Sequence, residues 1–209
     1  MFKYDKISMF LNIFTSVIIN QEFMKTAKGI NASDYINFDT ALNTGIKLLN
    51  DVKKQKVGLY ILTSIYTGLR TGDIQKLTWE MFKNDTFTII EEKTGKARTI
   101  QVHPNLKKAI NKLCEGKSGM IFISQKKTVY STQALNRILK EIFSKQAKSE
   151  HISTHSLRKT FGRRVYDMQN QSEHALTVLS QMFGHSNIQI TRIYLGLKQE
   201  EFNSIYLSL

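Results

Sequence analysis

Apolar residues recur every three or four positions along most of the chain, which is the spacing of helices that bury one face. From residue 39 onward the pattern predicts helices over residues 41–50, 58–67, 73–77, 105–115, 131–147, 154–169 and 173–183, followed by a pair beyond residue 186. Gly68 follows the second of these helices and suits a left-handed cap, because glycine adopts a positive φ without strain. The chain is therefore expected to be mainly helical.

Residues 79–102 change to the alternating pattern of strands. The runs TFTII (residues 86–90) and RTIQV (residues 98–102) flank EEKTGKA, in which Thr94 and Gly95 suit a turn. We predict a small antiparallel hairpin with a third short strand near Met81. The expected fold class is mainly α with a small antiparallel β-sheet, an α+β fold.

The N-terminal part is predicted to be separate from this domain. Apolar residues in 9–19 recur at helical spacing, but eleven residues are too few to cross a bilayer and no small-residue cleavage site follows them. Residues 26–37 lack the pattern and contain Gly29 and Asn31, as expected for a linker. We therefore divide the chain into a helical appendage and linker (1–38) and a main domain (39–209).

The charge of the chain indicates a polyanionic partner. Lys and Arg number 30 against 17 acidic residues, which gives a net charge of +13. Nucleic acid is the leading partner, and an anionic membrane surface is the alternative. Cys114 is the only cysteine, so an intrachain disulfide is excluded and a reducing, cytoplasmic location is expected.

The run THSLRKTFGRRV (residues 154–165) places two candidate anion ligands at the start of a predicted helix. Backbone N–H groups at a helix N-terminus, with His155 and Arg158 in the first turn, suit one phosphate. The alternative is a solvated basic face. The predicted buried side of this helix comprises Leu157, Phe161, Val165 and Met168, and the adjacent stripe comprises His155, Lys159 and Arg163.

Three further fragments carry candidate chemistry. Arg70 lies between two glycines in YTGLRTGD and presents its planar fork to phosphate oxygens if the turn faces a ligand. Lys93 precedes the hairpin turn, with Lys96 and Arg98 beyond it, and a mobile lysine there can donate a proton. For each of these positions taken alone, an ordinary solvated surface loop is the commoner interpretation.

In the third fragment, MFGHSNIQITRIYLG, His185 and Tyr194 are nine residues apart. Gly184 can end one helix and Ser186 or Asn187 can cap the next, so both side chains can reach one cleft. Either side chain can also be a packed core residue.

Taken together, TGLRTGDIQKLTW, KTGKARTI, HSLRKTFGRR and FGHSNIQITRIYLG resemble the motifs of the tyrosine recombinases, also called phage-type integrases, over residues 39–206. The resemblance implies the catalytic domain of that family. The catalytic set it implies is Arg70, Lys93, His155, Arg158, His185 and Tyr194. The DNA contacts expected beside it are Lys96, Arg98, Lys159 and Arg163.

The resemblance implies a site-specific DNA recombinase that cleaves and rejoins strands through a 3′-phosphotyrosyl intermediate, without ATP, metal or cofactor. A type IB topoisomerase-like enzyme and a non-catalytic DNA-binding regulator are the alternatives. Family members place a helical core-binding domain ahead of the catalytic domain, so residues 1–38 are interpreted as a possible remnant of it. An apolar stripe of Phe202, Ile205, Tyr206 and Leu209 docks either on its own domain or on a neighbour, and a homotetramer on double-stranded DNA is the expected assembly.

Overall fold

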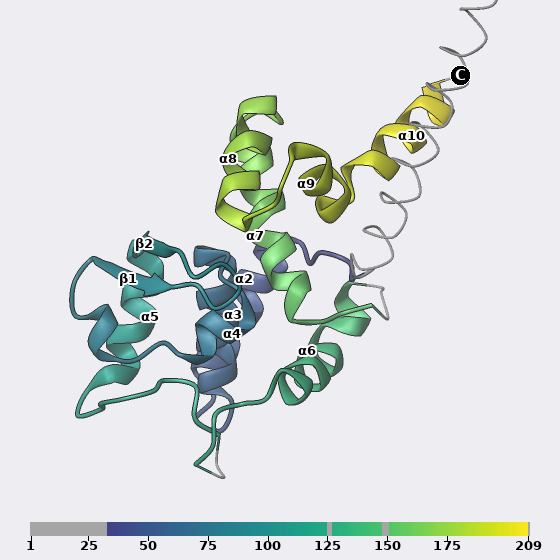
Figure 1. Cartoon of the computed structure of the whole chain (residues 1–209). Coiled ribbons are helices and arrows are strands. Elements are labelled where there is room, and N and C mark those ends of the chain that lie inside the picture. Colours follow the sequence, from purple (N-terminus) through teal and green to yellow (C-terminus); the bar gives the residue numbers. More distant parts are fainter. Residues whose placement is uncertain (1–32, 125–126, 148–150, 209) are drawn as a thin grey trace, which may run out of the picture. The chain divides into compact units, whose positions relative to one another are not determined.

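Helices make up most of the described chain, as Figure 1 shows. The computed structural model describes residues 33–208 except 125–126 and 148–150, with the backbone alone at 147 and 198–203. The helix predicted over residues 9–19 and most of the predicted linker lie outside the described residues. No helix in the described ranges combines the length and apolar character that a bilayer crossing requires.

The centre of the domain is α3 (Gln55–Thr67), which is buried along almost its whole length. The preceding helix, α2 (Phe38–Leu49), packs along it and is capped by the Asn37 side chain, which accepts from the backbone N–H groups of Asp39 and Thr40. Gly68 ends α3 with φ 60° and ψ 22°, which confirms the predicted left-handed cap. The short helix α4 (Thr71–Gln75) follows directly.

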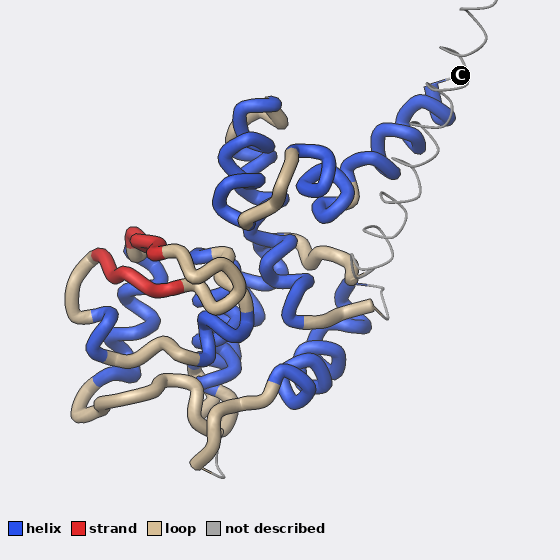
Figure 2. Tube along the Cα trace, viewed as in Figure 1, coloured by secondary structure: helices blue, strands red, loops and turns tan. Residues whose placement is uncertain are grey.

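A single antiparallel hairpin follows α4, and Figure 2 shows its two strands in red. Strand β1 (Thr86–Ile90) pairs with β2 (Ala97–Gln101), with Thr86 opposite Gln101 and Ile90 opposite Ala97. The prediction of a third strand near Met81 is wrong. Residues Glu80–Phe82 form a 3-10 turn, η1, because backbone bonds from Phe82 to Trp79 and from Lys83 to Glu80 satisfy the segment locally.

Six helices complete the domain in the predicted order, and the first four lie within one residue of their predicted bounds. They are α5 (Pro104–Cys114), α6 (Thr132–Ala147), α7 (Thr154–Met168), α8 (Glu173–Phe183), α9 (Ile188–Leu195) and α10 (Leu197–Ser208). A capping box between Ser153 and Ser156 starts α7. Left-handed glycines, Gly184 and Gly196, end α8 and α9.

The helix α7 connects two apolar clusters. Leu157 in its first turn belongs to the large cluster around α3, and Tyr166 near its end belongs to a smaller cluster formed with α8 and α9. Met168, predicted to be buried on the same side as Leu157, is 66% exposed because Tyr166 fills the position against α8 instead. The N-terminal turn of α7 therefore lies where the two clusters meet.

The last helix, α10, leaves apolar side chains in solvent. Ile205, Tyr206 and Leu207 are exposed by 58%, 74% and 89%. The side chains of Phe202 and Leu209, which the predicted stripe includes, lie outside the described residues.

The contact between α2 and α3 gives a test of the packing. We expect Gly58→Ala to reduce the free energy of unfolding by about 1–3 kcal/mol, as overpacking does. A Cβ atom at Gly58 would lie 2.5 Å from the backbone N of Leu49 and 2.6 Å from the carbonyl O of Gly45, and backbone cannot rotate away.

Gly45→Ala is the matched control, because both positions gain the same helix propensity from alanine. A Cβ atom at Gly45 meets the Cδ2 end of the Leu62 side chain at 2.8 Å, which can rotate. Urea unfolding of both variants should show the larger loss for Gly58→Ala, and equal losses would contradict the packing described.

Candidate active site

Two predicted arginines meet at the C-terminal ends of α3 and α8. Arg70 Nη2 and Arg158 Nη2 both donate to the carbonyl of Phe183, at 2.5 and 3.3 Å, and Arg158 Nη1 donates to the carbonyl of Gly68 at 2.6 Å. Helix C-termini leave carbonyls without intrahelical partners and carry a partial negative charge, which favours cations there. Because the carbonyls hold the two guanidinium planes, both arginines are fixed before any ligand arrives.

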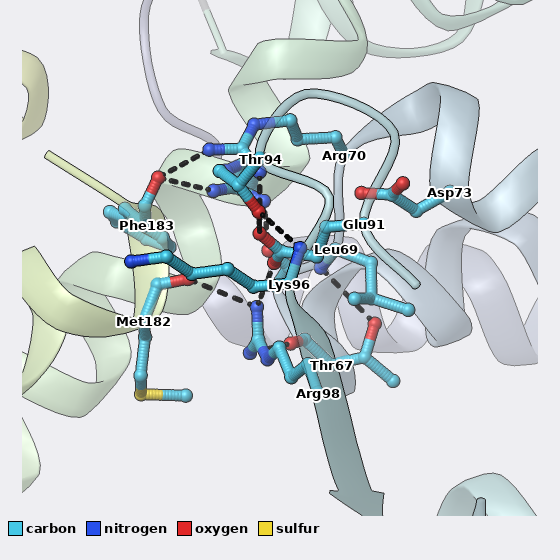
Figure 3. A network of polar contacts seen from close by, with 12 residues as sticks. Thr67, Leu69, Arg70, Asp73, Glu91, Thr94, Lys96, Arg98, Met182 and Phe183 are labelled. Carbon is cyan, nitrogen blue, oxygen red and sulfur yellow. Dashed lines mark hydrogen bonds and ion pairs between the residues drawn. The ribbon is translucent and has the colours of Figure 1, made fainter. Parts of the chain in front are cut away.

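A third arginine and a buried carboxylate extend this cluster, as Figure 3 shows. Arg98 from β2 donates to the carbonyls of Thr67 and Met182 at 3.1 and 3.0 Å. Glu91, at the end of β1, accepts from Arg70 at 3.1 Å and from Arg98 at 3.3 Å. The hairpin is thereby tied to both helix ends.

The two predicted histidines lie in the field of these cations. Desolvation, followed by the charges of Arg158, Arg70 and Lys93, lowers the pKa of His185 to about 4. The Nδ1 atom of His185 shares a hydrogen bond of 2.8 Å with Thr191 Oγ1 in α9. At neutral pH the ring is therefore uncharged and held in one orientation.

The pKa of His155, in the first turn of α7, is also lowered, although this residue is exposed. Desolvation and then the charges of Arg158 and Lys159 lower its pKa, with smaller effects from Arg70 and Lys93. A neutral imidazole can accept a proton, which is the requirement for a general base. Lys93 is exposed at the tip of the hairpin, and its charge contributes to the lowered pKa of both histidines.

Tyr194 completes the set from α9. Its ring lies edge-on to Phe183 and His185, with centroid separations of 5.4 and 5.3 Å. Desolvation of its buried hydroxyl raises the pKa of the phenol to about 12 despite the opposing charges of Arg158 and Arg70. The structure thus groups four of the predicted catalytic residues around Phe183: its carbonyl accepts from Arg70 and Arg158, and its ring contacts His185 and Tyr194.

The predicted DNA contacts are placed differently from one another. Lys96 is exposed beside the hairpin turn, as expected. Arg98 instead binds protein carbonyls, and Lys159 is 7% exposed with its ammonium on the carbonyl of Ser33 at 2.6 Å and 5.2 Å from the Tyr194 ring centre. The charged groups of Arg98 and Lys159 are therefore directed into the protein, because helix ends and loop carbonyls offer them partners there.

Arg163 also lies inward, where its Nη1 donates to the carbonyl of Leu195 at 3.4 Å and its guanidinium stacks on Tyr35 at 4.7 Å. Tyr35 belongs to residues 33–37, a segment that runs along α7. Ile36 and Thr160 exchange two hydrogen bonds in the same contact, at 3.0 and 2.6 Å. The basic stripe of α7 therefore serves largely to hold this segment and α9.

Sequence reasoning missed Glu91 and Phe183. The signal for Glu91 was present, because Phe87 and Ile89 are the buried positions of β1 and Glu91 continues the same alternation. A carboxylate on the buried face of a strand requires a cationic partner. Phe183 contributes its backbone carbonyl, which accepts from Arg70 and Arg158, and no pattern of side chains in the sequence indicates such a role.

The fold defined by these helices and the hairpin is that of the tyrosine recombinase catalytic domains. The crystal structure of XerA recombinase matches with a TM-score of 0.61 and 19% identity, over 83% of this chain and 64% of that chain. A lambda integrase dimer bound to a COC′ core site matches with a TM-score of 0.55 and 18% identity, over 78% of this chain and 59% of that chain. At these identities the likeness concerns the fold.

Sequence comparison gives the family. The probable integrase/recombinase YoeC of Bacillus subtilis (strain 168) is 28% identical over 164 residues, which cover 76% of this chain and 86% of YoeC. Tyrosine recombinase XerD of Neisseria meningitidis is 40% identical over 83 residues, which cover 39% of this chain but only 27% of XerD. The sequence model of the phage integrase family matches residues 46–201, and the chain belongs to that family.

The partly buried His185 predicts a pH-dependent stability. An unfolded His185 takes up a proton near its ordinary pKa of 6.5, whereas the folded chain resists protonation until about pH 4. Stability from this group is therefore complete above about pH 6.5 and is lost as the pH falls toward 4. We expect the melting temperature to fall across this window, and to fall less in His185→Gln.

His174→Gln is the control, because His174 is exposed on α8. The control should retain the full fall of the wild type. An identical pH profile for His185→Gln and the wild type would show that desolvation of His185 does not govern acid stability.

Proposed function

We propose that this chain is a site-specific DNA recombinase that cleaves one strand with Tyr194 and rejoins it to another. The observation that carries the proposal is the shared contact with Phe183, whose ring packs against Tyr194 and Arg158 and whose carbonyl accepts from Arg70 and Arg158. A nucleophile, a cationic clamp for a phosphate and neutral imidazoles are the groups that transfer of a phosphodiester requires. The DNA complexes of lambda integrase and its relatives support DNA as the substrate class.

In the proposed reaction the phenolic oxygen of Tyr194 attacks the scissile phosphorus while His155 takes the phenolic proton. Arg70 and Arg158 donate to the non-bridging oxygens as negative charge builds, and His185 adds a hydrogen bond. The bond from phosphorus to the 5′ oxygen breaks, and Lys93 supplies the proton to that oxygen. The products are a 3′-phosphotyrosyl ester and a free 5′ hydroxyl.

Rejoining reverses these steps with a different strand. A 5′ hydroxyl from a second duplex attacks the phosphotyrosyl ester, and Tyr194 leaves with a proton. The ester keeps the energy of the broken bond, so the proposed cycle needs neither ATP nor metal. Each guanidinium has five N–H groups, so the two carbonyl bonds of Arg158 leave donors for phosphate oxygens.

The DNA surface is proposed to include Lys96 at the hairpin, within a chain whose net charge is +13. Assembly is proposed to occur through α10, whose last turn exposes Ile205, Tyr206 and Leu207. Exposed apolar side chains of this size mark interaction sites. Exchange between two duplexes cleaves four strands, so four protomers on DNA are the expected assembly.

Tyr194→Phe tests the chemistry. We expect the variant to form no covalent adduct while its DNA affinity changes by less than about twofold, because only the nucleophilic oxygen is removed. The substrate is a pool of labelled duplexes with a randomised core and a nick that lets the short 5′ fragment diffuse away, which traps the adduct. The readout is the fraction of label retained by denatured protein.

Tyr206→Phe is the matched control, since Tyr206 is an exposed tyrosine on α10. The control should trap label like the wild type. A wild-type chain that binds the pool but traps no label would instead be a DNA-binding regulator, and an adduct in Tyr194→Phe would place the nucleophile at another residue.

Replacement of Ile205, Tyr206 and Leu207 together by serine tests the assembly. We expect the melting temperature of the free chain to change by less than about 2 °C, because surface substitutions alter stability little. The same variant should bind a trapped duplex but form no four-protomer complex, measured by light scattering after chromatography. A large loss of thermal stability would show that these side chains pack on their own domain.

A further inference from the structure

The turn of the hairpin is fixed by a carboxylate that the proposed chemistry does not use. Glu91 is 5% exposed, at the end of β1 and two residues before Lys93. Its backbone N–H donates to the carbonyl of Lys96 at 3.0 Å, and its carbonyl accepts from Gly95 at 2.8 Å. The residue therefore closes the turn through its backbone as well as its side chain.

The side chain of Glu91 connects three parts of the site, as the dashed lines in Figure 3 show. One carboxylate oxygen, Oε2, accepts from Arg70 at 3.1 Å and from the Thr94 hydroxyl at 2.9 Å. The other oxygen, Oε1, accepts from Arg98 at 3.3 Å. The carboxylate thus joins the loop after α3, the hairpin turn and strand β2.

Glu91 is charged in this position. Burial alone would raise the pKa of the carboxyl, but the hydrogen bond from Thr94 and the charges and hydrogen bonds of the two arginines hold the pKa below its usual value. The Glu91 side chain is 7% exposed and the Arg70 side chain 19%, so little solvent screens the attraction between them. A charged hydrogen bond of this kind restrains the guanidinium more firmly than a neutral one does.

The surroundings leave Arg70 little freedom to reach a different orientation. Its Nη2 donates to the Phe183 carbonyl, and a Cβ atom at Gly184 would lie 3.3 Å from both that Nη2 and Thr94 Cγ2. The guanidinium is therefore held between the hairpin turn and the end of α8. A shift of Glu91 would move Arg70 and the turn together.

We propose that Glu91 is a positioning residue for strand cleavage, which orients Arg70 toward the scissile phosphate. The inference rests on the proposed function. A positioning role differs from a purely structural one in one respect. Loss of the Glu91 charge should slow cleavage, because Arg70 loses its orientation, while folding and DNA affinity are kept.

The test compares Glu91→Gln with Glu92→Gln on the trapped duplex selected from the randomised pool. Glutamine keeps the shape of Glu91 and removes its charge. Glu92 is the next residue on the same hairpin, but it is exposed and its partner is Lys76 at 3.0 Å. We expect Glu91→Gln to form adduct about tenfold more slowly at saturating protein, with DNA affinity within about twofold of the wild type, and Glu92→Gln to match the wild type.

A double-mutant cycle identifies the route of the effect. If Glu91 acts through Arg70, then Arg70→Ala combined with Glu91→Gln should cleave no more slowly than Arg70→Ala alone. Thr94→Val removes one hydrogen bond from the carboxylate without a change of charge or size, and we expect it to slow cleavage by a few-fold. Thr94→Val carries the test if Glu91→Gln does not fold.

The outcomes separate this inference from the proposed function. Equal adduct rates for the wild type and Glu91→Gln, or an undiminished effect of Glu91→Gln in the Arg70→Ala background, would overturn the inference alone. Failure of the wild type to form any adduct would overturn both. A tenfold loss that disappears without Arg70 supports the positioning role.

Discussion

The ends of two helices determine how this site is built. Because α3 and α8 each stop at a left-handed glycine, their last carbonyls point away from the helix axis with unused acceptor capacity. Three arginines, Arg70, Arg98 and Arg158, use those carbonyls as their principal partners. The chain thereby concentrates positive charge at one place without an equal number of carboxylates, which would compete with a phosphate.

The same concentration of charge explains the state of the other groups. Imidazoles beside fixed cations lose their protons easily, so both histidines remain neutral and available at physiological pH. The phenol of Tyr194 experiences opposing effects, because burial favours the protonated form and the arginines favour the ionised form. The arginines therefore act on the nucleophile as well as on the phosphate in the proposed reaction.

Much of the fold followed from the spacing of apolar residues, and the catalytic set followed from motifs whose order matched the family. The long basic side chains were harder to predict. Arg98 and Lys159 occupy positions that periodicity places beside the site, but their stems are flexible and the partners that draw them inward are backbone carbonyls of distant segments, Thr67 and Ser33. Met81 was misassigned for a related reason, since a 3-10 turn and a short strand have similar apolar content and differ only in where the backbone bonds go.

The contact of residues 33–37 with α7 also links this segment to the site. The carbonyl of Ser33 accepts from Lys159, the backbone N–H of Ile36 donates to Thr160, and the guanidinium of Arg163 stacks on Tyr35. Residues 33–37 are therefore held against one helix by three contacts. Because residues 33–37 are bonded to the helix that carries His155 and Arg158, a substitution that loosens this contact would also disturb the helix that positions those two side chains.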